Sequence, residues 1–357
     1  MKIILLLIIL FMSACTPQEK LVWDIEPEEI YEEEEEEEEE EPGDPFYGLA
    51  PHPLTGVWQP EELAIYRPLA LVVSNIPQAL PQSGLAQADI IFEVLAEGGI
   101  TRLVAIFTQG DAEKIGPMRS TRDYFAHFAH DFGALLAHHG GSPTGYSMVR
   151  TLGLPNADGM SLESRYFWRD RDRVRRGALE HSSYTNIENL RNFMNNRGIN
   201  QEFVTNVPFN FYKEFTEPLG FGVRQVTIPF SNFHTAVFVY DEETFTFRRY
   251  QRGRPHMDEN TDEQLEASNI IIQRTPMHVI AGDPELRMNV SSVGSGQGYL
   301  VTGGRYMPIT WEKADRNSQT LWRSIDGEPI TLNPGQTWIA VVPVNANINF
   351  DFSLPED

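Results

Sequence analysis

Short apolar runs separated by polar turns dominate the first half of the chain. The segments "LALVVSNI" (69–76) and "ADIIFEVL" (88–95) are rich in β-branched residues, and "TRLVAIFTQ" (101–109) alternates apolar with polar positions. Because successive side chains of a strand point to opposite faces, these patterns predict three strands. Gly98 and Gly99 predict a tight turn between the second strand and the third.

Helical patterns follow the strands. The segments "SMVRTLGL" (147–154) and "IENLRNFMNNRG" (187–198) carry apolar residues at helical spacing. The second segment ends at Gly198, a residue that favours the left-handed conformation at a helix C-terminus. Residues 64–215 are therefore predicted to mix α and β structure.

The second half of the chain carries mainly strand patterns. Residues 236–253 predict a hairpin that turns at 241–243, and residues 262–267 predict one short helical turn. The sequence "GSGQG" (294–298) looks like a phosphate-binding loop, but no helix pattern follows it, so a β-turn or bulge is predicted instead. Further strand patterns lie at 269–275, 296–313 and 337–344.

These elements predict an α+β protein in two parts. About 310 residues follow the N-terminal segments described below, which is more than a single hydrophobic core usually holds. We expect a mixed α/β N-terminal domain at 46–215 and a strand-rich C-terminal domain at 216–357. The sequence contains no Walker loop, HExxH metal motif or GxSxG elbow, and its histidines lack ligand spacing, so no metal site is predicted.

The N-terminus has the pattern of a lipoprotein signal peptide. The apolar run from Ile3 to Phe11 is too short to span a bilayer, and the small residues Ser13 and Ala14 precede Cys15. Cys15 is the only cysteine, so the chain cannot form an internal disulfide. We expect residues 1–15 to be a signal peptide and lipidated Cys15 to be the first mature residue, anchored in the bilayer at the extracytoplasmic face. An ordinary signal peptide with an incidental cysteine is the alternative.

Residues 16–45 are strongly acidic. They hold one lysine against sixteen Asp and Glu, a net charge of −15, with ten consecutive glutamates at 32–41. Such a run repels itself and cannot bury apolar surface, so it predicts a disordered linker that acts as a spacer. A divalent-cation buffer and a docking tail for a basic partner are the alternatives.

The charge of the remaining chain is uneven. Residues 46–357 hold 26 Lys and Arg against 35 Asp and Glu, a net charge of −9, whereas residues 101–200 alone carry a net charge of +3. A nucleic-acid-binding protein would show a broad basic face, which this composition does not provide. Nucleic acid is therefore not an expected partner.

Three stretches of the first half gather side chains that could bind or react. In "IGPMRSTRDYF" (115–125), Arg119 and Arg122 would share one face of a helix that begins after Pro117, and the helix N-terminus with both arginines would bind an anion. A surface helix cap with two solvated arginines is the alternative.

The second stretch is "LLAHHGGSPTG" (135–145), in which two histidines end an apolar run. Gly140 and Gly141 let the backbone bend beside His138 and His139, which suits a general base or a ligand-positioning group. A core histidine beside a structural turn is the alternative. Adjacent strand residues face opposite sides, so only one of the two histidines would face a given site.

The third stretch, "FWRDRDRVRRGALEH" (167–181), contains five arginines between Arg169 and Arg176 and ends at His181. As a strand it would place four arginines on one face and two aspartates on the other. A solvated ladder of paired charges is the alternative, in particular for Arg171, Arg175 and Arg176.

These three motifs, with "ALPQSGLAQADIIFEVLAEGGITRLVAIF" (79–107) before them and "HMDENTDEQLEASNIIIQ" (256–273) after them, resemble the YerB-like lipoproteins of Gram-positive bacteria. The family is defined by N- and C-terminal domains of unknown function, so the resemblance implies an architecture and a location. The sequence departs from the family pattern at Glu180-His181-Ser182, where relatives read Pro-His-Asn.

The resemblance implies a set of ligand-binding residues. Those that match the family pattern are Arg102, Arg119, Ser120, Arg122, His138, Gly140, Gly141, Ser142, Arg169, Asp170, Arg173, His181 and Tyr184. The first hypothesis is a non-catalytic lipoprotein that binds an anionic cell-wall polymer, a lipid-linked precursor or an envelope protein through an Arg/His cleft, without a cofactor.

The alternative hypothesis is an envelope enzyme. The order of these motifs loosely resembles that of phosphoryl transferases that attach glycopolymers to the cell wall. Arginines would then hold a phosphate, and Asp89, Asp123 or Asp170 would help to bind Mg²⁺. The candidate catalytic residues are His138, His181 and Asp170, with a histidine as the general base. A peptidoglycan hydrolase is a further alternative.

Overall fold

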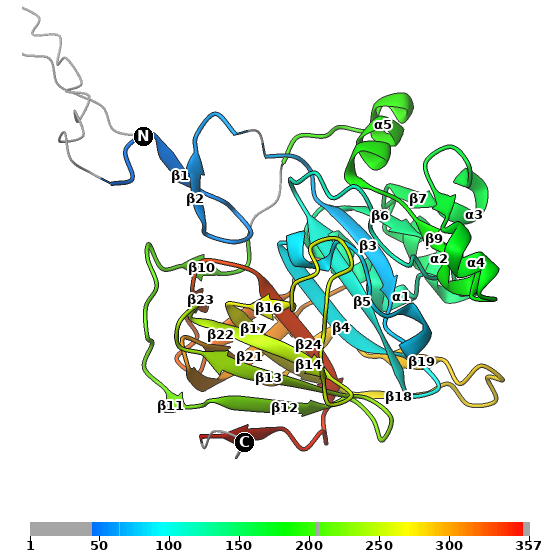
Figure 1. Ribbon diagram of the computed structural model, residues 1–357. Coiled ribbons are helices and arrows are strands. Elements are labelled where there is room, and N and C mark those ends of the chain that lie inside the picture. The colour runs from blue at the N-terminus through cyan, green and yellow to red at the C-terminus, as the bar shows by residue number, and fades with distance from the viewer. Residues whose placement is uncertain (1–44, 64, 204–206, 353–357) are drawn as a thin grey trace, which may run out of the picture. The chain divides into compact units, whose positions relative to one another are not determined.

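The computed structural model describes residues 45–63, 65–203 and 207–352. Its largest sheet has eleven strands, which come from both halves of the sequence (Figure 1). The first half provides β3 (Leu69–Ser74), β4 (Ile90–Glu97), β5 (Ile100–Phe107), β6 (Leu135–His138) and β7 (Asn156–Asp158). The second half provides β11 (Phe221–Gly222), β17 (Asn269–Thr275), β20 (Gly294–Thr302), β21 (Arg305–Lys313), β22 (Leu321–Ser324) and β24 (Thr337–Pro343).

The two halves of the sequence meet in this sheet at β4. One edge of β4 pairs with β24 in parallel, and the other pairs with β5 in antiparallel orientation. Gly98 and Gly99 form the turn between β4 and β5, and both have a positive φ. The strands predicted at 69–76, 88–95 and 101–109 are confirmed. The sheet runs across the predicted boundary between residues 215 and 216.

The α-helices of the described residues all come from the first half. They are α1 (Asp123–Asp131), α2 (Pro143–Thr151), α3 (Gly159–Leu162), α4 (Arg171–Arg175) and α5 (Ile187–Arg197), with 3-10 turns at Pro77–Ala79, Leu85–Gln87 and Leu179–His181. Helix α1 packs against β3, β5 and β6. Asn186 is the N-cap of α5, and its side chain accepts a hydrogen bond from Asn189 N at 2.8 Å. Gly198, with a φ of 64°, is the C-cap. The predicted helix with a glycine C-cap is confirmed.

A second sheet of six strands comes from the C-terminal half. It contains β12 (Gln225–Pro229), β13 (Thr235–Asp241), β14 (Thr246–Gln251), β15 (Arg254–Pro255), β16 (Glu266–Ala267) and β25 (Asn349–Asp351). β13 and β14 form the hairpin predicted at 236–253. Two-stranded pairs are formed by β1 (Leu49–Pro51) with β2 (Trp58–Pro60), β8 (Trp168–Arg169) with β9 (Ser183–Tyr184), β10 (Asn210–Phe211) with β23 (Thr331–Leu332), and β18 (Met277–Val279) with β19 (Met288–Val290).

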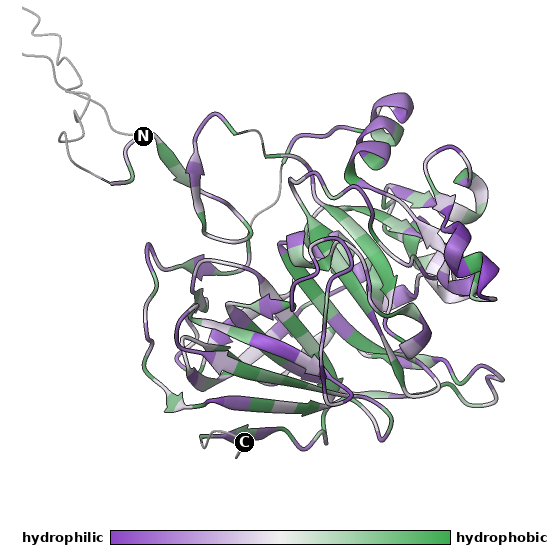
Figure 2. Cartoon of the chain, in the orientation of Figure 1, coloured by the Kyte–Doolittle hydropathy of each residue, from purple (hydrophilic) through white to green (hydrophobic). Residues whose placement is uncertain are grey.

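The central strands of the large sheet form the core. Every residue of β3 is buried, as are nearly all residues of β4, β5 and β24. Figure 2 shows hydrophobic colour along β3, β4 and β5 and hydrophilic colour on α4. The protein is thus strand-rich with few helices, and strands buried on both faces explain why β3 reads as a continuous apolar run.

Four local expectations are wrong. Met118 and Thr121 form isolated β-bridges, and α1 begins only at Asp123, because Arg122 takes the extended conformation of an N-cap. The Arg/Asp stretch forms the short helix α4, because Asp170 caps its first turn. Residues 262–267 contain strand β16, which pairs with β14. The segment 294–298 is the first part of β20, paired throughout with β21.

The predicted signal peptide, the lipidated Cys15 and nearly all of the acidic linker lie outside the described residues. Among the residues that the structure describes, no helix combines the length and apolar character needed to cross a membrane.

Candidate functional site

Two arginines from the predicted set share one carboxylate at the end of β4. Glu97 accepts hydrogen bonds from Arg102 through Oε1 and from Arg122 through Oε2, the latter at 2.7 Å. Arg102 Nη1 also donates to the carbonyl of Ser120 at 2.7 Å. Burial lowers the pKa of Arg102 to about 9, and Glu97 opposes that shift. Both arginines are buried, and their hydrogen bonds hold the loop at 119–122 in place. Two guanidinium charges face the single carboxylate of Glu97, which leaves a net charge of +1.

Arg119 and Arg169 are partly exposed instead, and each is oriented by a backbone carbonyl. Arg119 Nη1 donates to Glu180 O at 2.9 Å, and Arg169 Nη1 donates to Leu179 O at 2.9 Å. The exposed fractions of the two side chains are 23% and 25%. Adjacent residues of one 3-10 turn therefore hold two guanidinium groups that remain accessible to solvent.

The counter-ions of these two arginines are exposed glutamates. Glu180 Oε2 lies 3.5 Å from Arg119 Nη2, and its side chain is 77% exposed. Glu163 Oε1 accepts from Arg169 Nε at 3.0 Å and is 38% exposed. Glu180 is the residue at which this sequence departs from its family's proline, so the departure supplies a carboxylate for Arg119.

His139 lies between Arg169 and Ser183. Its Nε2 is 2.8 Å from Arg169 Nη2, and its Nδ1 is 2.9 Å from Ser183 Oγ. A guanidinium only donates, so Nε2 must accept and the neutral ring carries its proton on Nδ1. Nδ1–H then donates to Ser183. Burial and the Arg169 charge both lower the pKa of His139, in keeping with a neutral ring.

His181 lies close to the same arginines but is nearly buried. Its Nδ1 is 3.5 Å from Ser74 Oγ, and 8% of the residue is exposed. Burial lowers the pKa of His181, and the charge of Arg119 lowers it further, while Glu180 raises it. The lowered pKa of His181 favours its neutral form.

His138 and the loop after it have structural contacts. His138 is fully buried, and its Nδ1 donates to Gly140 O at 2.8 Å. Gly140 has a φ of 76° and donates its N–H to Asp158 Oδ1 at 2.9 Å. Ser142 caps α2 by accepting from Gly145 N at 3.0 Å. An added Cβ at Gly141 would lie 2.9 Å from Thr121 Cγ2, so this loop packs tightly against the arginine loop.

Asp170, Arg173 and Tyr184 join α4 to the rest of the chain. Asp170 caps α4 and accepts from Lys114 Nζ at 3.0 Å. Arg173 is buried and donates to the carbonyls of Gln78, at 3.1 Å, and Pro81, at 2.8 Å. Tyr184 is fully buried. Lys114 Nζ lies 4.4 Å from the centre of the Tyr184 ring, while the Tyr184 hydroxyl has no hydrogen-bond partner among the described residues. The structure therefore brings Arg102, Arg119, Arg122, Arg169, His139 and His181 together, while Asp170, Arg173 and Tyr184 contact α4 and its neighbours.

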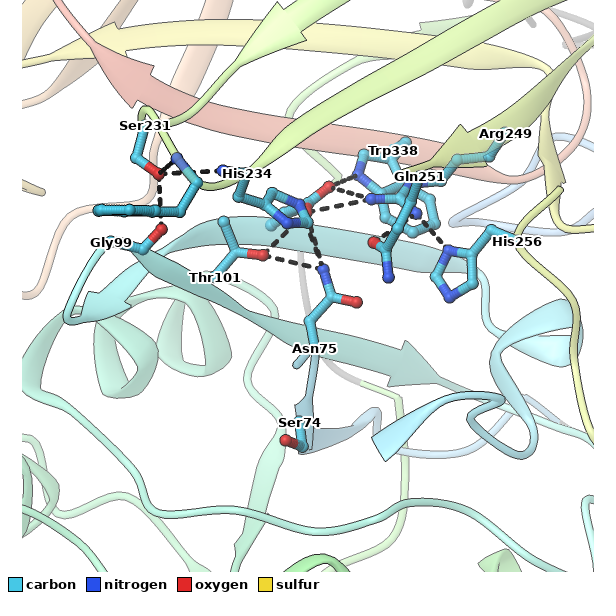
Figure 3. Close-up of polar contacts among 12 residues, drawn as sticks. Ser74, Asn75, Gly99, Thr101, Ser231, His234, Arg249, Gln251, His256 and Trp338 are labelled. Atoms are coloured by element: carbon cyan, nitrogen blue, oxygen red, sulfur yellow. Dashed lines mark hydrogen bonds and ion pairs between the residues drawn. The ribbon is translucent and has the colours of Figure 1, made fainter. Parts of the chain in front are cut away.

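A buried polar network connects the two sheets (Figure 3). Glu93 of β4 accepts from Arg249 Nη2 at 2.9 Å and from His234 Nε2 at 2.7 Å. Burial alone would raise the pKa of Glu93, but the Arg249 charge and the His234 hydrogen bond hold it far below its usual range. Arg249 also donates to His256 Nδ1, and His256 Nε2 donates to Gln82 at 2.6 Å. Each of these residues bonds to another protein group, so the network is an internal structural element, although Arg249 Nε has no hydrogen-bond partner among the described residues.

Several of these residues were not found from the sequence. Glu163 follows α3 and Ser183 begins β9, both outside the three sequence motifs, and Arg249 reads as one residue of an ordinary strand. Glu93 lies within an apolar run and Glu97 shortly after it, and a charge at such a position indicates a buried partner without identifying it. The other site residues acquire their roles through contacts between segments that are distant in the sequence, which local patterns do not reveal.

The carboxylates proposed for Mg²⁺ have separate surroundings. Asp89 accepts from Thr108 N and Thr108 Oγ1, both at 2.7 Å, Asp123 lies in the first turn of α1, and Asp170 pairs with Lys114. Within the described ranges, no group of three or more His, Cys, Asp or Glu side chains is placed to hold a metal ion.

Comparison with known proteins assigns the family. The models of the N-terminal and C-terminal domains of a protein family of unknown function, DUF3048, match residues 54–200 and 226–339. The chain belongs to the DUF3048 family. This result confirms the YerB-like family membership expected from the sequence.

Known DUF3048 proteins support the assignment and the fold. "Putative lipoprotein YerB" of Bacillus subtilis (strain 168) is 30% identical over 299 residues, which are 82% of this chain and 86% of the relative. The crystal structure of YerB from Bacillus subtilis matches with a TM-score of 0.74 and 28% identity, over 84% of this chain and 99% of that chain.

Proposed function

We propose that this DUF3048 protein is an extracytoplasmic lipoprotein, anchored through Cys15, that binds an anionic envelope ligand between Arg119 and Arg169. The observation that carries the proposal is that both side chains are held in a fixed orientation and yet remain accessible to solvent. Each guanidinium is oriented by a backbone carbonyl, is about a quarter exposed, and has an exposed glutamate as its counter-ion.

An anionic ligand would displace Glu180 from Arg119 at little cost. Exposed ion pairs contribute only about 0–1 kcal/mol each. Arg119 meets Glu180 through a single contact of 3.5 Å, so a phosphate or carboxylate that accepts two parallel hydrogen bonds would bind Arg119 more strongly than Glu180 does. Glu163 already accepts two hydrogen bonds from Arg169, at 3.0 and 3.1 Å, so at Arg169 the ligand would replace a bidentate pair. Arg102 and Arg122 below the site add one unneutralised positive charge. The ligand class is therefore a cell-wall polymer, a lipid-linked precursor or an envelope protein that presents phosphate or carboxylate groups.

Binding fits the histidines better than catalysis does. A general base needs an unprotonated nitrogen that faces the nucleophile. Of the catalytic candidates, His138 is buried and donates to Gly140 O, and His181 is nearly buried, with its Nδ1 3.5 Å from Ser74 Oγ. Asp170, the third catalytic candidate, is engaged by Lys114 and by the first turn of α4. These contacts favour a binding protein over a phosphoryl transferase or hydrolase.

The test is a titration of the full-length chain in detergent with poly(glycerol phosphate) as the anionic probe. The double variant Arg119→Ala/Arg169→Ala is expected to bind at least tenfold more weakly without a change in melting temperature. The matched control is Arg171→Ala/Arg175→Ala, which removes the same charge from exposed positions of α4. An equal loss in the control would show that only overall charge matters and would refute the proposed site.

A further inference from the structure

A cavity whose chemistry differs from that of the arginine site around Arg119 and Arg169 lies beside α5. Its volume is about 810 Å³, within the range typical of small-molecule sites. The loop after β5 forms one wall and α5 forms the other, and none of the predicted ligand-binding residues lines it. We propose that this cavity, here called the α5 groove, binds a hydroxyl-rich saccharide that carries amino groups.

The first observation is a set of side-chain amides. Asn186, Asn195 and Gln201 line the α5 groove, and each amide offers both donors and an acceptor. Gln201 Nε2 donates to Asn195 Oδ1 at 2.5 Å, and Asn186 Nδ2 donates to the carbonyl of Glu113 at 3.3 Å. Asn186 Oδ1 also caps α5, and Gln201 Nε2 also donates to the carbonyl of Arg191 at 3.4 Å. These contacts fix the amides and leave a donor on Asn186 and an acceptor on Gln201 for a ligand. Sugar hydroxyls, which both donate and accept, match such groups.

The second observation is an aromatic platform. Tyr66 lines the α5 groove and is 44% exposed. The guanidinium carbon of Arg191 lies 5.0 Å from the centre of its ring. Arg191 is held in place because it donates to the carbonyls of Arg67, at 2.7 Å, and Thr108, at 2.9 Å. A supported tyrosine ring next to fixed amides provides an apolar face for a sugar ring and a polar edge for its hydroxyls.

The third observation is the charge of the lining. Asp111, Glu113 and Glu188 are exposed carboxylates of the α5 groove, and Arg191 is its one basic residue among the described lining residues. Because the guanidinium of Arg191 already donates to two backbone carbonyls, it is poorly placed to bind an anion. The excess of carboxylates disfavours phosphate and favours ammonium groups. The α5 groove and the arginine site therefore select ligands of opposite charge.

The experiment compares two oligosaccharide probes on the full-length chain in detergent by calorimetric titration. A glucosamine oligomer is expected to bind at least fivefold more tightly than an N-acetylglucosamine oligomer of the same length. Tyr66→Ala is expected to weaken both at least tenfold, whereas Tyr47→Ala, a matched control at another exposed tyrosine, changes neither. Glu113→Gln/Glu188→Gln is expected to abolish the preference for the amine while the N-acetylated oligomer still binds.

Three results would overturn the inference: no binding of either oligomer to the unaltered protein, full affinity in Tyr66→Ala, or an amine preference that survives in Glu113→Gln/Glu188→Gln. Capture of poly(glycerol phosphate) by Tyr66→Ala is measured in parallel and is expected to be unchanged. Failure of the α5 groove is thereby distinguished from failure of the arginine site.

Discussion

Glu93 and Arg249 form an ion pair in which both side chains have no exposure to solvent, with Arg249 Nη2 2.9 Å from Glu93 Oε2. The two residues are 156 positions apart and belong to different sheets, β4 and β14. Arg249 also lies over the ring of Trp338, whose Nε1 donates to Glu93 Oε2 at 3.1 Å. The pair thus joins β4, β14 and β24 at one point in the interior.

Loss of the Glu93 charge is expected to destabilise the protein severely. Glu93→Gln leaves the Arg249 guanidinium buried without a counter-ion, which typically costs about 3–5 kcal/mol. Urea denaturation of both proteins measures the difference. The control is Glu243→Gln, at an exposed position of the β13–β14 turn, which is expected to change stability by less than about 0.5 kcal/mol. Equal stability of Glu93→Gln and the unaltered protein would contradict the role assigned to the pair.

Asp89 is expected to make stability fall as the pH rises. Burial raises its pKa from 3.8 to about 7, although the two hydrogen bonds from Thr108 oppose the shift. Between these values the folded protein keeps a proton that the unfolded chain has released. The contribution of Asp89 to stability is therefore complete below its unfolded pKa and is lost as the pH approaches its folded pKa, by about 2 kcal/mol between pH 5 and 7.

The measurement is urea denaturation of the unaltered protein and Asp89→Asn at pH 5 and pH 7. Because other groups also titrate in this interval, the informative quantity is the difference in pH dependence between the two proteins. Asp89→Asn is expected to lose less stability on going to pH 7. Asp111→Asn, at an exposed position, is expected to follow the unaltered protein. Parallel pH profiles for Asp89→Asn and the unaltered protein would show that Asp89 is ionised throughout.

Local sequence patterns predicted those helices and strands whose conformation depends mainly on their own residues. β3 and β5 could be predicted because their apolar side chains suit a buried strand, and α5 because Asn186 and Gly198 cap its ends. The pairing of β4 with β24 could not be predicted, because two apolar strands carry no local signal for each other. The helix α4 was missed since its alternating charges suit a strand, while the cap from Asp170 decides for a helix.

The sequence predicted which arginines belong to the candidate site, but not which of them are buried and which are exposed. Sequence motifs selected Arg102 and Arg119 equally, yet the structure buries the first against Glu97 and leaves the second partly exposed. Exposure depends on how the loops at 116–122 and 179–183 pack together, which is a tertiary property. The same packing places Glu180 beside Arg119, so the residue that departs from the family pattern serves as the counter-ion of Arg119.

Removal of that counter-ion is expected to strengthen binding at the arginine site. Glu180→Gln leaves Arg119 oriented by the backbone carbonyl of residue 180 but without a competing carboxylate. The affinity for poly(glycerol phosphate) is expected to rise threefold or more, most clearly at low ionic strength. Glu188→Gln makes the same charge change outside the site and is the control. An unchanged affinity in Glu180→Gln would mean that the polymer does not contact Arg119.

Gly298 is expected to tolerate no side chain, because two strands of the large sheet approach closely there. A Cβ added at Gly298 would lie 2.2 Å from the carbonyl oxygen of Ile272 in β17, a backbone atom that cannot move without breaking the ladder. Gly298→Ala is therefore expected to cost at least about 2 kcal/mol in urea denaturation, within the range of severe core substitutions. Gln297→Ala, at the adjacent exposed position of β20, is expected to cost less than about 1 kcal/mol. If the two variants were equally stable, β17 and β20 would have room to separate, and the glycines of this segment would have no packing role.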